Sequence, residues 1–114
     1  KDTKECQMAI ESRDFSRLAA VVEANCLAMH ATMIASRPSL IYCQPATLEL
    51  ISRVRALRAS GLECLFTIDA GPTVFVLVSQ RDEMRVIEDL RTVAGVESCR
   101  RTEICRGAHL LPTS

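Results

Sequence analysis

The sequence predicts an α+β fold, in which helices pack on one face of a small antiparallel sheet. Three segments carry apolar residues at intervals of three or four, which is the spacing of a helix face. Two short β-type runs, residues 62–68 and 74–79, follow one another with five residues between them. This separation is typical of two antiparallel strands joined as a hairpin.

Two helices are expected in the first third of the chain. Residues 2–12 form a short helix, and Asp14 is suited to cap the next one. That second helix runs from Phe15 to near Ser36, because Pro38 disfavours helical geometry in the residue before it. Its apolar residues occupy more than one side, which predicts burial on more than one side. One face consists of Phe15, Leu18, Val22, Cys26, Met29 and Met33.

A third helix is expected after a proline-containing connection, residues 37–45. It starts near Pro45, and Gly61 suits the left-handed position that closes a helix. Glu49 and Arg53 are spaced to pair on its outer face. Its predicted buried stripe is Leu48, Ile51, Val54 and Leu57.

The predicted hairpin has residues 69–73 as its loop, and a fourth helix follows it. That helix opens at Gln80 or Asp82 and ends at Gly95. Its expected face is Met84, Ile87, Leu90 and Val93. A last strand is predicted at residues 96–104, followed by a loose tail.

Length and composition indicate one globular domain spanning residues 1–114. Hydrophobic residues make up 48% of the chain, which argues against disorder. The formal net charge is zero, which argues against a nucleic-acid partner. No apolar run approaches the roughly 20 residues that span a membrane, so no membrane partner is expected. The chain starts without an apolar signal segment or a Met, so we expect a fragment of a longer protein.

Six cysteines are expected to be free thiols in a reducing cytoplasm. No two of them are separated by only two to four residues, as paired zinc ligands usually are. Cys26 and Cys64 lie in apolar segments, where a reduced cysteine behaves as a small core residue. We therefore predict neither disulfides nor a metal site.

Asp69 is the strongest candidate for chemistry, because it is the one acid at a predicted strand end beside a glycine. Three roles are open to its carboxylate: a general base, a metal ligand or a cap of its own loop. Turn composition alone favours the loop cap. The amides of Ala70 and Gly71 are suited to face an anion, since glycine lets a ligand approach closely.

Other polar residues point more weakly to function. His30 lies on a mostly apolar helix with no second ligand four residues on, which favours a hydrogen-bonded structural histidine. Tyr42 suits a packing role. The arginines of residues 53–58 and of the tail are expected to form solvated faces, and His109 receives no role. Glycine-rich phosphate loops of the common kinds are absent from the sequence.

Three motifs in order resemble a known family. Residues 25–32 contain Met-His-Ala-Thr, residues 37–42 are followed by Pro45-Ala46-Thr47, and residues 66–72 read Phe-Thr-Ile-Asp-Ala-Gly-Pro. Together they resemble the C-terminal part of mevalonate diphosphate decarboxylase, a member of the GHMP superfamily of small-molecule kinases. The likeness covers roughly residues 4–95 and implies a ferredoxin-like C-terminal domain.

The resemblance implies an enzyme of isoprenoid and sterol biosynthesis. It would convert mevalonate 5-diphosphate to isopentenyl diphosphate, while ATP becomes ADP and phosphate and CO₂ leaves. Asp69 would be the catalytic acid residue, and the Ala70–Gly71 backbone would contact the substrate. A separate N-terminal domain would bind ATP and Mg²⁺, so this chain alone is expected to be inactive. The oligomeric state, including a homodimer, is left open.

Two departures from the family pattern bear on the substrate. The family loop usually continues with Asn where this chain has Thr73, and Cys43 replaces a bulkier residue. Decarboxylation of mevalonate monophosphate is therefore one alternative. A second alternative, from another class, is a stand-alone α+β module that binds a small ligand or regulates without catalysis.

Overall fold

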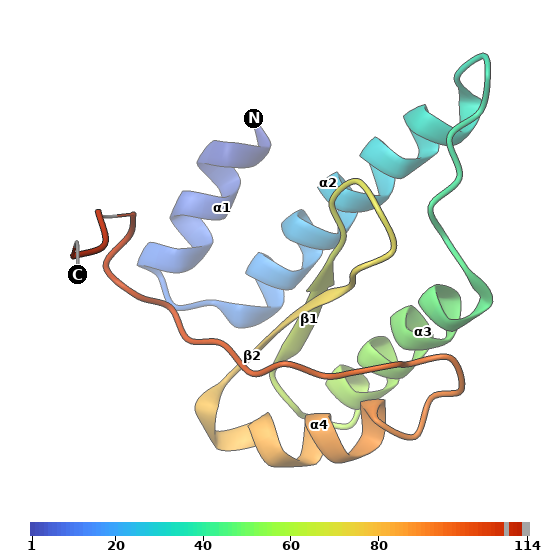
Figure 1. Cartoon of the computed structure of the whole chain (residues 1–114). Helices are drawn as coiled ribbons and strands as arrows, with labels where there is room; N and C mark the ends of the chain where they lie inside the picture. Colours follow the sequence, from blue (N-terminus) through green and yellow to red (C-terminus); the bar gives the residue numbers. More distant parts are fainter. Residues whose placement is uncertain (109, 113–114) are drawn as a thin grey trace.

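The computed structural model describes residues 1–108 and 110–112 and shows helices gathered around one β-hairpin (Figure 1). The hairpin packs on α2 and α3, while α1 lies along α2 and α4 lies beside α3. The predicted α+β class is confirmed. In chain order the elements are α1 (Asp2–Glu11), α2 (Phe15–Ala35), α3 (Pro45–Ala59), β1 (Cys64–Thr67), β2 (Phe75–Val78), the 3₁₀ turn η1 (Gln80–Asp82) and α4 (Glu83–Leu90).

The helix ends follow the predicted local signals. Asp14 caps α2, because its Oδ1 accepts a hydrogen bond from the Arg17 backbone N–H at 3.0 Å. The Gln44 backbone N–H donates to Thr47 Oγ1 at 3.0 Å at the start of α3. Gly61 follows α3 with φ +107°, a left-handed conformation that side chains disfavour.

The sheet consists of two antiparallel strands in the register Cys64↔Val78 to Thr67↔Phe75. Both strands are shorter than predicted, but the hairpin and its loop are where the sequence placed them. The first three residues of β1 are buried and Thr67 is half-buried, whereas β2 alternates between exposed and half-buried residues. The core therefore lies between β1 and the helices. The largest fully buried side chains are Phe66, Leu65, Val54, Val86 and Cys64.

The predicted last strand is wrong. Residues 96–104 have no regular secondary structure, and residues 97–105 are exposed. A strand gains stability from a paired neighbour and a buried face, and this segment has neither. Arg101 instead forms an ion pair with Glu83, which joins the segment to α4, and a second pair with Glu103 inside the segment.

Two predicted helix faces also need correction. Leu48 and Met84 are 61% and 68% exposed, so these two residues do not belong to the buried faces, whereas Ile51, Val54, Leu90 and Val93 are buried as predicted. α4 ends at Leu90, and turns lead on to Gly95. Its side of the core consists of Val86, Leu90 and Val93.

Helix α2 ends at Ala35, close to the predicted end near Ser36, but it is more apolar than the sequence analysis indicated. By length and composition alone it qualifies to cross a membrane, with 21 residues and a mean hydropathy of 1.5. The expectation that no apolar run approaches a membrane-spanning length is therefore wrong. Core helices of soluble proteins pass the same test, and α2 covers β1 here. The expected absence of a membrane partner therefore stays a prediction.

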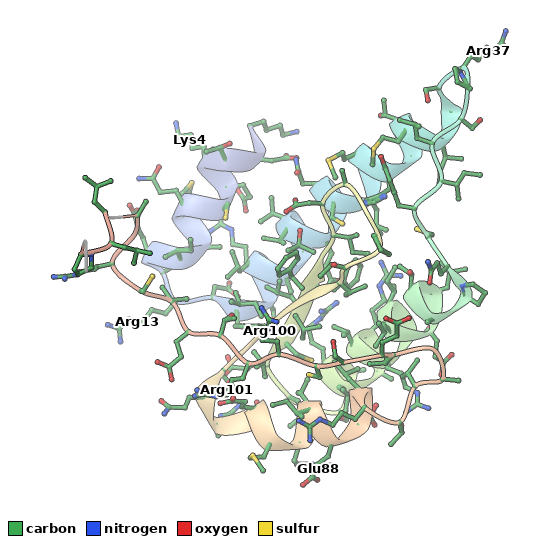
Figure 2. All side chains as sticks on the ribbon, in the orientation of Figure 1. Lys4, Arg13, Arg37, Glu88, Arg100 and Arg101 are labelled. Atoms are coloured by element: carbon green, nitrogen blue, oxygen red, sulfur yellow. The ribbon has the colours of Figure 1, made fainter. Side chains whose placement is uncertain are left out.

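Charged side chains are spread around the outside of the molecule. Lys4, Arg13, Arg37 and Glu88 project outward from four different parts of the chain (Figure 2).

All six cysteines are free thiols, as predicted. Cys26 and Cys64 are buried, and burial raises the pKa of the Cys64 thiol. A raised pKa keeps this thiol neutral and unreactive at neutral pH.

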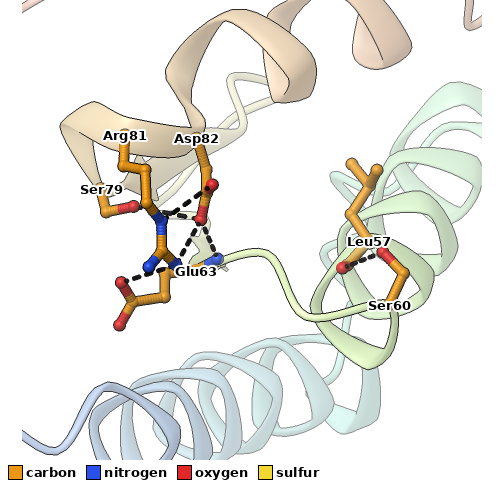
Figure 3. Close-up of polar contacts among 6 residues, drawn as sticks. All are labelled: Leu57, Ser60, Glu63, Ser79, Arg81 and Asp82. Carbon is orange, nitrogen blue, oxygen red and sulfur yellow. Dashed lines mark hydrogen bonds and ion pairs between the residues drawn. The ribbon is translucent and has the colours of Figure 1, made fainter.

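Asp82 anchors the start of β1 to the start of α4 (Figure 3). Its Oδ2 accepts hydrogen bonds from the Glu63 backbone N–H at 2.8 Å and from Ser79 Oγ at 3.3 Å. The Arg81 guanidinium lies 3.1 Å from the same oxygen. Hydrogen bonds from Arg81 and from the Glu63 amide hold the pKa of Asp82 below its usual value.

This anchor predicts a loss of stability in acid. A depressed folded-state pKa contributes stability above the unfolded pKa of about 3.9, and that contribution disappears as the pH falls through the folded value. Urea unfolding between pH 7 and pH 3 should therefore show a steeper acid loss for the wild type than for Asp82→Asn. The asparagine keeps an oxygen acceptor for the Glu63 amide but has no charge to lose. Parallel stability curves for the two proteins would contradict this assignment.

Candidate active site at the end of strand β1

Asp69 lies two residues beyond β1, where the hairpin loop begins. Its side chain is exposed, and none of the hydrogen bonds or ion pairs among the described residues involves its carboxylate. The loop-cap interpretation, in which this group binds amides of its own hairpin, is therefore wrong. The carboxylate is free to act on another molecule.

The loop after Asp69 leaves room for a ligand. Ala70 is exposed and Gly71 is half-buried. Gly71 has φ +108°, and a Cβ built there would meet no atom within 4 Å. Glycine thus serves the backbone conformation here, and the space beside it stays open.

Asp69 does not line either of two hollows in the domain. A hollow of about 570 Å³ lies between α1 and α2 and reaches Thr67, but Asp69 does not line it. A second hollow, of about 400 Å³, lies between α4 and the segment around Cys99 and Arg101. The Asp69 side chain is exposed, so the cavity that the catalytic hypothesis expects before its carboxylate is not formed by either of these hollows.

Helix α2 holds the backbone immediately before Asp69. Ile68 is 2% exposed, and its N–H donates to Cys26 Sγ at 3.2 Å. Its carbonyl oxygen lies 2.9 Å from His30 Nε2 and 3.5 Å from Cys26 Sγ. Both α2 side chains are 4% exposed. The prediction of a hydrogen-bonded structural histidine is confirmed for His30.

Glu23, one helical turn before Cys26, binds the middle of the same strand edge. Its Oε2 accepts a hydrogen bond from the Phe66 N–H at 3.2 Å. Arg58 contacts both carboxylate oxygens of Glu23, at 2.6 and 2.8 Å, and also donates to the Cys64 carbonyl at 2.9 Å. The hydrogen bonds to Glu23 raise the pKa of Arg58, so its guanidinium stays charged.

The two edges of β1 are therefore satisfied in different ways. One edge pairs with β2, and the Glu63 carbonyl extends that pairing by accepting from the Ser79 N–H at 3.0 Å. Backbone groups of the alternate residues 64, 66 and 68 instead bind side chains of α2 and α3. An unpaired strand edge in a core is costly, and these side chains take the place of a further strand.

Sequence reasoning missed most of this arrangement. Glu23 was assigned no role, although a single carboxylate within an apolar helix was a usable signal. The arginines of residues 53–58 were predicted to be solvated, and this is wrong for Arg58, which binds a buried acid. Tyr42 packs its ring at 90° against His30, with 6.5 Å between centroids, in agreement with its packing role. His109 lies outside the described residues.

The described residues offer no place for a metal. They contain no group of three or more His, Cys, Asp or Glu side chains arranged to hold an ion. The chain also lacks a recognisable phosphate loop.

Comparisons with known proteins agree with the motifs and the fold. The curated diphosphomevalonate decarboxylase mvd1 of Aspergillus fumigatus is 26% identical over 91 residues, which are 78% of this chain and 22% of that protein. The mevalonate diphosphate decarboxylase of Staphylococcus aureus superposes with a TM-score of 0.75 at 38% identity, covering 80% of this chain and 28% of that one.

A third relative was solved with ligands. The structure of MDDEF in complex with MVAPP, AMPPCP and magnesium has a TM-score of 0.73 at 35% identity. It covers 84% of this chain and 29% of that one. This chain thus spans less than a third of the length of each of these relatives.

The model of the mevalonate 5-diphosphate decarboxylase C-terminal domain matches residues 1–112, nearly the whole chain. The hairpin, the acid that follows β1 and the helices that hold it all lie inside this match. The chain belongs to the mevalonate 5-diphosphate decarboxylase C-terminal domain family.

Proposed function

We propose that this domain forms one wall of the active site of an ATP-dependent decarboxylase. The substrate is mevalonate 5-diphosphate and the product is isopentenyl diphosphate, a step of isoprenoid biosynthesis. The observation that carries the proposal is the exposed carboxylate of Asp69, which has no partner among the described residues and follows an anchored strand. The names of the relatives, and the substrate, nucleotide analogue and magnesium in one of their structures, support it.

In this proposal Asp69 acts on the 3-hydroxyl group of the substrate. A tertiary alcohol leaves poorly, so the γ-phosphoryl group of ATP is transferred to that oxygen. The Asp69 carboxylate accepts or orients the hydroxyl proton during the transfer. When phosphate departs, a cation-like carbon remains, and a nearby anion stabilises it. Loss of CO₂ then supplies the electron pair of the new double bond.

The backbone of Ala70 and Gly71 is proposed to face an anionic group of the substrate. Successive amide N–H groups beside a left-handed glycine form a small anion-binding concavity. The open space at Gly71 supports this role, because a ligand can approach the backbone there.

ATP and magnesium are proposed to bind mainly to another part of the enzyme. The described residues lack a metal-binding group, and the chain spans under a third of its solved relatives. We therefore propose that this domain is inactive by itself. Six free thiols support a reducing, cytoplasmic location.

The test uses the intact protein that contains this domain, supplied with ATP and mevalonate 5-diphosphate. Phosphate and CO₂ should be released in equal amounts, and a parallel assay with mevalonate 5-phosphate measures the preference for the diphosphate. If the enzyme turns over only mevalonate 5-phosphate, the monophosphate is its substrate and the proposed diphosphate substrate is wrong. Absence of turnover with both, together with ligand binding by this domain alone, would favour the non-catalytic module.

A further inference from the structure

The free carboxylate of Asp69 raises the question of what fixes its position. Its side chain has no hydrogen bond or ion pair with the described residues, so its own contacts do not orient it. The backbone before it is the remaining means of control. That backbone, at Ile68, is buried and bonded to two side chains of α2.

We propose that His30 is a positioning residue for Asp69, acting through the carbonyl group of Ile68. This inference rests on the proposed function of Asp69. The Ile68 carbonyl belongs to the same peptide unit as the N and Cα atoms of Asp69. Because a peptide unit is planar, a hydrogen bond that fixes the carbonyl oxygen also fixes the direction in which the Asp69 Cα lies.

The hydrogen-bond roles at His30 follow from the chemistry of the acceptor. A carbonyl oxygen accepts and never donates, so His30 Nε2 carries a proton and donates it across the 2.9 Å contact. The edge-on contact with Tyr42 packs a second group against the imidazole ring. The ring is therefore held at one end by Ile68 and packed by an aromatic side chain.

Cys26 assists but does not replace this bond. Its sulfur accepts from the Ile68 N–H at 3.2 Å and lies 3.5 Å from the Ile68 oxygen. Sulfur is a weak donor and a weak acceptor, so the imidazole supplies the stronger, directional contact. The two residues are four apart on one helix, which places them on the same face toward the strand end.

The test compares three variants of the intact enzyme. His30→Leu removes the donor, whereas His30→Gln keeps an N–H group at a similar distance from the helix. Val54→Ala is the matched control, because Val54 is 0% exposed in the same core but contacts Ile68 through no hydrogen bond. It reports what a loss of packing does by itself.

We expect His30→Leu to lower kcat by about 10- to 100-fold, because a small misplacement of a reacting group has an effect of this size. KM for the substrate should stay near the wild-type value, and His30→Gln should recover most of kcat. Val54→Ala should lower Tm while it leaves kcat unchanged. Equal kcat for His30→Leu and Val54→Ala at matched folded fraction would overturn the positioning role.

A second measurement separates this inference from the proposed function. Hydrogen exchange of the Ile68 amide, relative to the other amides of β1, should accelerate in His30→Leu and remain slow in His30→Gln. If exchange responds in this way but Asp69→Asn keeps full turnover, His30 does hold the backbone at Ile68, and the proposed function of Asp69 fails. If exchange at Ile68 is the same in all variants, His30 does not hold the strand end and the inference fails.

Discussion

Replacing Asp69 with asparagine in the intact enzyme is expected to lower kcat by about 10²- to 10⁴-fold, the usual contribution of a positioned acid or base. Asparagine keeps the size and the hydrogen-bonding capacity of the side chain but lacks the negative charge and cannot accept the proton. Release of phosphate and of CO₂ should fall together, because the first step limits both. Parallel assays of the two products by coupled phosphate detection and by trapping of labelled CO₂ make this measurement.

The same substitution should leave the fold almost unchanged. Asp69 makes no hydrogen bond or ion pair with the described residues, so the free energy of unfolding should change by less than about 0.5 kcal/mol. Glu88→Gln is the matched control, because Glu88 is an exposed acid that projects from α4 away from the body of the domain (Figure 2). Its kcat should equal that of the wild type. Near-normal turnover by Asp69→Asn would remove the catalytic assignment.

Replacing Glu23 with alanine is expected to destabilise the domain by about 3–5 kcal/mol, the usual cost of breaking a buried ion pair by removing one partner. The change leaves Arg58 without its carboxylate and the Phe66 N–H without an acceptor. Phe66 is 0% exposed, so little water can replace the oxygen that its N–H loses. Urea unfolding monitored by circular dichroism measures the change.

Two further variants show whether the loss comes from this pair. Glu49→Ala removes an acid that pairs with Arg53 on the exposed side of α3, and it should cost less than about 1 kcal/mol. Replacing Arg58 with methionine in the Glu23→Ala background should recover part of the stability, because no buried charge then remains unpaired. If Glu23→Ala and Glu49→Ala lower the free energy of unfolding equally, the Glu23–Arg58 pair stabilises the domain no more than an exposed ion pair does.

These predictions divide the strand into two functional parts. Glu23 and Arg58 satisfy its middle, where disruption affects the stability of the whole domain. His30 and Cys26 satisfy its end, where disruption is expected to affect the position of Asp69. A single helix face thus connects the folding of the core to the proposed chemistry of the loop.

Features that depend on neighbouring residues were determined by the sequence alone. The Asp14 cap, the helix start at Pro45 and the hairpin between residues 62 and 79 follow from turn chemistry and apolar spacing, and each was confirmed. The placement of Asp69 directly after a strand was predicted on the same grounds. Helix caps, turns and apolar spacing depend on residues within a few positions of one another. The sequence alone is therefore enough to predict them.

Features that depend on distant partners were decided only by the tertiary structure. The bonds that α2 makes to β1 and to Ile68 join residues 38 to 43 positions apart, and no local pattern identified Phe66 as the partner of Glu23 or Ile68 as the partner of His30. The residues 96–104 failed as a strand because a strand exists only where an edge and a buried face receive it. Tertiary packing decides which helix side chains bind the second edge of β1. No local sequence pattern indicates which backbone groups the sheet leaves without a partner.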